Sequence, residues 1–175
     1  QQLAAVGAAG IGRRMGNRLR DGRPVDPGRV PGHIAVRENA EKGLTRMEYL
    51  NVLAAAAGAF AFGAVWYIAM SKPWIAASEV PVDTSGKPAG GGPMPFIIGI
   101  VAMIVVAGMM RHIFQMAGID TVAKGVVAGA GIGAFFIVPW VAMNYAFAMR
   151  KAALTVIDGV NAIVGCAVMG LILTL

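Results

Sequence analysis

Apolar residues are gathered into four long stretches that occupy almost all of the chain after Tyr49. The stretches run over residues 49–70, 95–116, 122–148 and 153–175, and most polar residues lie between or before them. A helix rises ~1.5 Å per residue, so about 20 apolar residues cross the ~30 Å hydrocarbon core of a bilayer. Each stretch has about this length. The pattern predicts four transmembrane helices and therefore an integral membrane protein.

The connections between these stretches predict how the helices are arranged. Few residues separate the second stretch from the third, or the third from the fourth. Helices joined by such short segments pack as antiparallel neighbours. We therefore predict an all-α fold, an integral membrane four-helix up-down bundle. Four crossings place both ends of this bundle on the same side of the bilayer.

The first 46 residues differ from the rest of the chain. Residues 1–46 are rich in Arg, Gly and Pro and hold too few apolar residues for a core. They predict a poorly structured basic arm, and residues 47–175 make up the membrane domain. A short amphipathic helix over residues 3–19 is an alternative for part of the arm. Met47 also resembles a natural start, which would make the arm an upstream extension.

Composition and charge narrow the class of protein. The chain is 57% hydrophobic and only 14% charged, whereas soluble domains carry about 25% charged residues. Its net charge of +6 comes mostly from the arm, and basic residues beside membrane helices typically contact anionic lipid or mark the cytoplasmic side. We therefore expect the lipid bilayer as a partner, and no nucleic acid. The basic residues of the arm favour a topology in which both chain termini are on the cytoplasmic side. The charges in the loops of the membrane domain, taken alone, favour both termini on the outer side.

The sequence contains no pattern typical of a catalytic or metal site. Cys166 is the only cysteine, so neither an intrachain disulfide nor a multi-cysteine metal site is expected. The two histidines, His33 and His112, are far apart in the sequence and do not predict a metal site. Histidine, acidic and nucleophilic residues do not converge. We predict a protein that is not an enzyme and that has no cofactor.

Small residues recur at intervals of four in three of the helices. This spacing keeps them on one helix face, where the backbones of two membrane helices can approach closely. We predict that these faces pack inside the bundle, and the alternative is a docking face for a homodimer or for another membrane subunit. The residues are Ala55, Ala59 and Gly63 in the first helix, Gly125, Gly129 and Gly133 in the third, and Ala162, Cys166 and Gly170 in the fourth.

Aromatic and basic residues mark the helix ends. Trp and Tyr gather at membrane interfaces, and long basic side chains reach from helix ends to the headgroups. Pro139, inside the third helix, predicts a kink. The predicted interface anchors are Trp66, Tyr67, Lys72, Trp74, Arg111, Arg150 and Lys151.

Asp158 is the most informative single residue. An acidic group within a membrane helix is costly and is a functional candidate by default. Because Asp158 is near the start of the last helix, the alternatives are a carboxylate favoured by the helix dipole or one paired with Arg150 or Lys151. A polar contact to another helix is a further alternative. Asn161, on the same helix face, and Asn144 complete a candidate intramembrane polar site.

Three segments of the chain together resemble a known family. Gly63-Ala64-Val65-Trp66-Tyr67, followed by Lys72-Pro73-Trp74, resembles the G-x-x-W-Y and K-x-W signature of a first membrane helix. The last helix, over residues 157–173, is similar to the closing segment of the same family. This family is the domain of unknown function 1761, a group of small four-helix bacterial membrane proteins, and the resemblance covers about residues 47–175. It implies a fold and a location, and no chemistry.

These features together predict a non-enzymatic protein of the bacterial inner membrane. The expected role is that of an accessory or interaction subunit of a membrane complex, and the partner is another membrane protein or a second copy. The rival interpretation is a small transporter or channel, homodimeric, that uses Asp158 and Asn161. Transporters usually show broken helices and polar groups near the midplane, and this chain has few such groups.

Overall fold

The computed structural model describes residues 31–89 and 92–175, with side chains described from Arg46 onward. Over these residues the structure is helical, and the only extended pairing is one isolated bridge. The chain divides into two compact units, Gln1–Leu44 and Thr45–Leu175. The described part of the first unit is the beginning of helix α1, and the second unit contains the whole membrane domain. The predicted all-α fold is confirmed.

Four helical spans are long and apolar enough to cross a membrane, as predicted. Their bounds differ from the predicted stretches by only a few residues. The first is the Arg46–Ala69 part of α1 (Pro31–Ala69), the second is α3 (Met94–Ala117), the third combines α4 (Val122–Ile132), η1 (Gly133–Ile137) and α5 (Val138–Phe147), and the fourth is α6 (Ala152–Leu173).

Helix α1 begins well before its membrane-spanning part. It starts at Pro31, and the fixed φ angle of proline suits the first position of a helix. Apart from Gly32 and Gly43, the following residues of the arm contain no helix breaker. Apolar content marks where a helix can cross a membrane, and it does not mark where that helix begins. The predicted arm therefore becomes helical from Pro31 onward, and residues 1–30 lie outside the described residues.

A short helix that the sequence did not predict follows α1. This helix, α2 (Ser71–Ser78), contains Pro73 in its first turn, where proline removes no helical hydrogen bond. It ends at Glu79, which adopts a left-handed conformation with φ of 56° and donates its N–H to the Ile75 carbonyl. The residues around Trp74 are thus held on a helix rather than in an irregular interfacial segment.

The loop after α2 contains a turn organised by Asp83. The Asp83 Oδ1 atom accepts hydrogen bonds from the Ser85 hydroxyl at 2.7 Å, the Ser85 N–H at 2.8 Å and the Lys87 N–H at 3.0 Å. These donors, the Ser85 hydroxyl first, lower the pKa of the Asp83 carboxyl below its usual value. Val82 and Pro88 form the isolated bridge across this turn. The loop is therefore locally ordered around Asp83.

The third span changes its helical type halfway along. Residues Gly133–Ile137 form a π-helix, in which the Val138 N–H bonds to the Gly133 carbonyl. Pro139 lies two residues after Ile137 and has no N–H, and its ring crowds the carbonyl four residues earlier. A wider turn before the proline relieves this crowding. The irregularity predicted at Pro139 takes the form of this π-helix.

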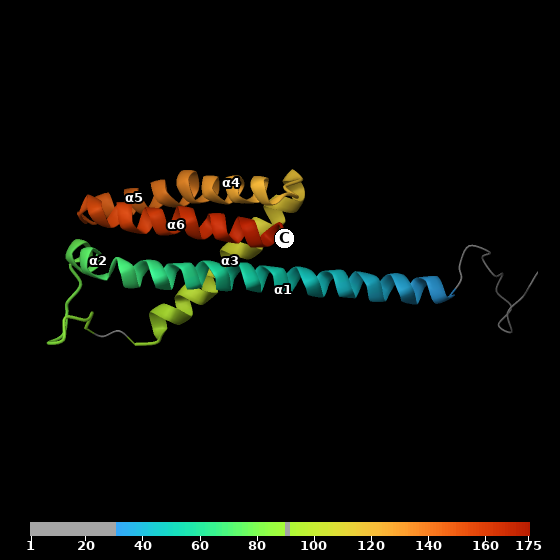
Figure 1. Cartoon of the computed structure of the whole chain (residues 1–175), viewed down its shortest axis with the longest axis horizontal. Helices are drawn as coiled ribbons and strands as arrows, with labels where there is room; N and C mark the ends of the chain where they lie inside the picture. Colours follow the sequence, from blue (N-terminus) through green and yellow to red (C-terminus); the bar gives the residue numbers. More distant parts are fainter. Residues whose placement is uncertain (1–30, 90–91) are drawn as a thin grey trace, which may run out of the picture. The chain divides into compact units, whose positions relative to one another are not determined.

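Helix α6 lies at the centre of the bundle. It contacts α2, α3, α4, η1 and α5, and it lies between α1 and the layer formed by α4 and α5 (Figure 1). Helix α3 is inclined to the other spans in the same view. The buried core joins residues of α1, α3 and α6, namely Ala55, Ala56, Ala59, Ala107, Met110, Phe114, Cys166, Met169 and Leu173. Both ends of α6 are therefore within reach of polar side chains from its neighbours.

Candidate functional site

The small residues of the third and fourth spans face each other. A Cβ atom built on Gly129 would overlap the Cys166 carbonyl oxygen, and one built on Gly125 would overlap the Gly170 carbonyl oxygen. A Cβ atom built on Gly133 would lie 2.6 Å from the Cα atom of Ile163 in α6. Only glycine allows two helix backbones to lie this close. These residues therefore join α4 and η1 to α6 inside the chain.

The small residues of α1 lie against the same central helix. Ala55 and Ala59 are buried in the core with Cys166. Gly63 lies opposite the Asn161 side chain, whose Oδ1 atom is 3.3 Å from the position of an added Cβ. Ala162, the remaining member of the predicted faces, is only partly buried. The structure places the small-residue faces between helices of this chain.

Near the start of α6, the Asp158 carboxylate accepts three hydrogen bonds from three other helices. The Tyr67 hydroxyl of α1 donates to Oδ1 at 2.8 Å, and the Trp74 Nε1 of α2 donates to the same oxygen at 3.2 Å. The Tyr145 hydroxyl of α5 donates to Oδ2 at 2.7 Å. Asp158 and these three donors, hereafter the Asp158 cluster, connect α1, α2 and α5 to α6.

The aromatic residues that were predicted as interface anchors direct their polar atoms at α6. Besides Tyr67 and Trp74, the Trp66 Nε1 donates to the Ile157 carbonyl at 3.1 Å. The Tyr67 and Trp74 rings meet edge to face with centroids 6.0 Å apart. The apolar parts of these rings pack against buried Leu154 and Ile157. The sequence indicated the end of the helix at which these residues lie, but not their partner.

The basic residues at this end of the bundle do not pair with Asp158. Arg150 donates to the Ser78 carbonyl at 3.1 Å, and Lys151 forms an ion pair with Glu79 at 3.0 Å. Among the residues whose side chains are described, Asp158 has no ion pair. It also lies beyond the first turn of α6, where the effect of the helix dipole has fallen off. The predicted pairing with Arg150 or Lys151 is therefore wrong, and neutral donors hold the carboxylate.

The two asparagines of the predicted polar site have different surroundings. Asn161 lies between α6 and α1, and its Oδ1 atom is buried without a hydrogen-bond partner among the described residues. Asn144 is exposed on α5, and the next residue, Tyr145, reaches Asp158 instead. The structure thus brings Asp158 and Asn161 to one face of α6 and leaves Asn144 outside. Tyr145 carried no signal in the sequence that distinguished it from other aromatic residues of the spans.

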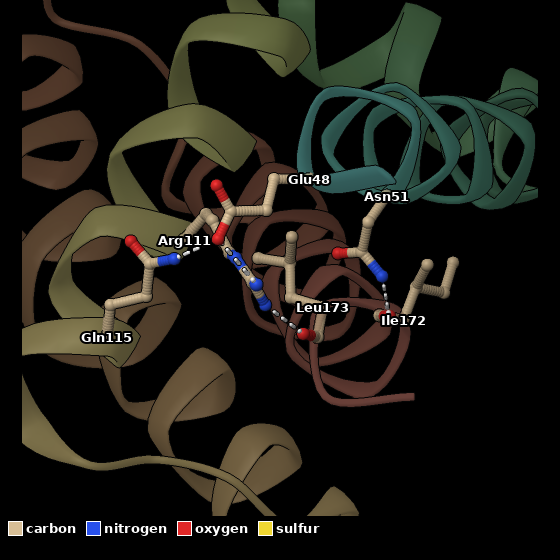
Figure 2. A network of polar contacts seen from close by, with 6 residues as sticks. All are labelled: Glu48, Asn51, Arg111, Gln115, Ile172 and Leu173. Atoms are coloured by element: carbon tan, nitrogen blue, oxygen red, sulfur yellow. Dashed lines mark hydrogen bonds and ion pairs between the residues drawn. The ribbon is translucent and has the colours of Figure 1, made fainter. Parts of the chain in front are cut away.

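The opposite end of α6 is capped by side chains of α1 and α3 (Figure 2). Arg111 Nη1 donates to the Leu173 carbonyl at 3.0 Å, and Asn51 Nδ2 donates to the Ile172 carbonyl at 3.0 Å. Carbonyls in the last turn of a helix have no N–H partner within the helix. A cation at this end is also favoured by the helix dipole. Arg111, predicted as an interface anchor, therefore caps α6.

Glu48 and Gln115 complete this second polar cluster. Glu48 Oε1 accepts from Gln115 Nε2 at 2.7 Å and forms an ion pair with Arg111 Nη2 at 3.4 Å. Figure 2 shows the Arg111 guanidinium between Glu48 and the Leu173 carbonyl. Glu48, Asn51 and Gln115 were not among the residues predicted from the sequence. The sequence did contain one signal of this cluster. Polar residues interrupt the apolar pattern near helix ends that lie on the same side of the bilayer.

Replacing Arg111 by methionine should lower the free energy of unfolding by about 1.5–3 kcal/mol, because a charged donor to a helix-terminal carbonyl is lost. Unfolding of the purified protein in detergent, followed by its helical circular dichroism, measures this loss. The matched control is His112→Gln, since His112 is the exposed neighbour of Arg111, and its effect should be within about 0.5 kcal/mol. Equal stability of the two variants would contradict the capping role.

The comparison with known proteins covers the Asp158 cluster and all of the second polar cluster except Glu48. A family model described as "Protein of unknown function (DUF1761)" matches residues 50–174, from the first span to the end of the last. No curated protein and no solved structure matches the chain significantly. The family resemblance inferred from the first and last helices is confirmed. The chain is a membrane protein with four apolar spans, and it belongs to the DUF1761 family of proteins of unknown function.

Proposed function

We propose that this protein is a non-enzymatic subunit of a complex in the bacterial inner membrane, where it associates with another membrane protein inside the bilayer. The main support comes from α3. Its consecutive residues Phe96, Ile97 and Ile98 are 64%, 52% and 61% exposed. Consecutive residues of a helix point about 100° apart. This part of α3 is therefore uncovered around most of its circumference.

The second half of α3 is packed more closely into the bundle than the first. Its buried residues are Ala107, Met110 and Phe114. In the first half, Gly99 approaches Phe60 of α1, with 3.4 Å from an added Cβ to the ring. The small-residue faces already pack inside the chain, so they are not free for a partner. The first half of α3 is the surface that we assign to the second protein.

The test is purification from the native membrane in a mild detergent, followed by mass spectrometry of every protein that co-migrates. The α3 variant Val101→Trp adds bulk at a residue that is 56% exposed, and the control Val127→Trp does the same at a 72% exposed residue of α4. We expect a stoichiometric partner that is lost with the first variant and kept with the second. A chain that migrates alone, or a partner unaffected by Val101→Trp, would overturn the proposal.

The second candidate is a small homodimeric transporter or channel that uses Asp158 and Asn161. It is favoured by one observation, that the Asp158 carboxylate contacts neutral donors and no cation among the described residues. An acidic residue in a membrane span is a functional candidate for this reason. The test is pH-dependent cation flux into vesicles that contain the purified protein. Flux that is lost in Asp158→Asn supports this candidate, and equal flux in both proteins removes it.

A further inference from the structure

We propose that α2 is a releasable lid over the Asp158 end of α6. The lid is held closed by contacts between the end of α2 and the turn that joins α5 to α6, hereafter the latch. The proposal is independent of both candidate functions, because it concerns how this end of the bundle opens. The latch consists of Ala76, Ser78 and Glu79 on one side and of Arg150 and Lys151 on the other.

Helix α2 covers a small part of α6. Trp74 Nε1 donates to the Asp158 Oδ1 atom at 3.2 Å, and Ala77 is buried in an apolar cluster with Leu154 and Ile157 of α6. If α2 moved away, the Asp158 carboxylate would keep its two tyrosine donors, which belong to α1 and α5. Helices α1, α5 and α6 would therefore stay connected through this carboxylate while α2 is released.

The latch is made of polar contacts that are open to solvent. Arg150 donates to the Ser78 carbonyl at 3.1 Å, and Lys151 Nζ donates to the Ala76 carbonyl at 2.9 Å. Lys151 also pairs with Glu79 at 3.0 Å, and both of these side chains are 56% exposed. Exposed ion pairs contribute little stability and are screened by salt. The contacts that hold the end of α2 are thus of a kind that breaks and re-forms easily.

The backbone is strained on both sides of the latch. Within the described ranges, Glu79 and Met149 are the non-glycine residues with positive φ, at 56° and 53°. Helix α3 ends in the same conformation with Gly118, and glycine adopts it without steric cost. Strain of this kind persists where surrounding contacts hold it, and it is common at clamps and switch segments. Glu79 belongs to the latch and Met149 directly precedes it, so the strain lies where the lid is held.

The other end of α2 has a hinge at Met70. This residue separates α1 from α2 with φ of −95° and ψ of 13°, which lies between the helical and extended regions. Its N–H donates to the Trp66 carbonyl and its carbonyl accepts from the Trp74 N–H, both at 2.8 Å. Helical hydrogen bonds therefore continue on both sides of one distorted residue. Hinges are typically such residues at the ends of elements, and a change in the Met70 dihedral angles is enough to move α2 relative to α1.

The experiment measures how fast a cysteine in α2 of the full chain reacts with a polar maleimide in lipid nanodiscs at fixed pH. The probe is Ser78→Cys, because Ser78 is 6% exposed and cysteine is similar in shape. Ala107→Cys, at a core residue that is 0% exposed, reports opening of the whole bundle, and the buried native Cys166 gives the background. We expect Ser78→Cys to react much faster than Ala107→Cys. Equal rates at the two positions would overturn the lid.

Two substitutions in the Ser78→Cys protein show whether the latch controls the reaction. Lys151→Met removes the contacts to Ala76 and Glu79 and should speed the labelling roughly tenfold. The matched control Lys124→Met removes an ion pair of the same kind at the start of α4, with Asp120 at 2.8 Å, and should leave the rate unchanged. Added salt should speed the labelling with Lys151 present and have little further effect in Lys151→Met. A rate that Lys151→Met does not change, or that Lys124→Met changes equally, would overturn the latch.

Discussion

Replacing Gly129 by alanine is expected to destabilise the protein by about 2 kcal/mol or more, which corresponds to a fall in Tm of roughly 4–8 °C. The added Cβ would overlap the Cys166 carbonyl oxygen and would lie 2.9 Å from the Cys166 carbonyl carbon and 3.2 Å from the Ala167 Cα. All three atoms belong to the backbone of α6 and cannot rotate away. The two helices must therefore separate, and the neighbouring contacts of Gly125 and Gly133 weaken with them.

The matched control is Gly131→Ala, on the same helix. A Cβ at Gly131 would meet no atom within 4 Å, and alanine is a better helix former than glycine by about 1 kcal/mol. Gly131→Ala should therefore leave the stability unchanged or raise it slightly. Thermal unfolding of both variants in the same detergent gives the comparison. If both variants unfold like the wild type, α4 and α6 are not packed through their glycines.

The second large effect is expected for Asp158→Ala, which should lower the stability by about 2–4 kcal/mol. The hydroxyls of Tyr67 and Tyr145 and the indole N–H of Trp74 would all lose their acceptor. Each donor left without a partner in a buried position costs about 1–3 kcal/mol. Because these groups are only partly buried, the lower part of that range applies. Denaturant unfolding followed by tryptophan fluorescence measures the loss, since Trp74 belongs to the cluster.

Asp158→Asn separates the hydrogen bonds of this residue from its charge. An amide oxygen can accept from both Tyr67 and Trp74, and the amide NH2 can donate to the Tyr145 oxygen after its hydroxyl rotates. The asparagine variant should thus lose less than about 1 kcal/mol. If it is as unstable as Asp158→Ala, the charge itself holds the helices together, and the hydrogen bonds are of secondary importance.

The fold was predictable because its main determinant is local. The length and apolar content of each stretch depend on neighbouring residues only, and they located all four spans to within a few residues. The start of α1 and the existence of α2 escaped the same criterion, since both lie in segments that are too polar for a membrane. The spacing of Gly125, Gly129 and Gly133 indicated a contact face, and the interdigitation with α6 follows from the glycine backbones.

The partners of the polar residues were much less predictable. The sequence separation between Tyr67 and Asp158 is 91 residues, and that between Asn51 and Ile172 is 121 residues. Pairs so distant depend on how each helix is rotated about its own axis, which apolar length does not determine. An expectation based on sequence neighbours favoured Arg150 and Lys151 for Asp158. The carbonyls of Ser78 and Ala76, at the end of the unpredicted α2, bind these side chains instead.

The π-helix of the third span has a consequence for which residue meets the acid. Its wide turn inserts one residue, so every later residue takes the angular position that its predecessor would occupy in an unbroken α-helix, a rotation of about 100°. Val138 accordingly reaches Gly159, at 3.3 Å from an added Cβ, and Tyr145 occupies the direction that Asn144 would otherwise have. Rewinding Gly133–Ile137 as an α-helix would therefore exchange a phenol for an amide beside Asp158, whereas deleting one residue of this segment would remove the wide turn and keep Tyr145 in place. In this span the helical type of Gly133–Ile137 determines which side chain, several residues further along the helix, faces the Asp158 carboxylate.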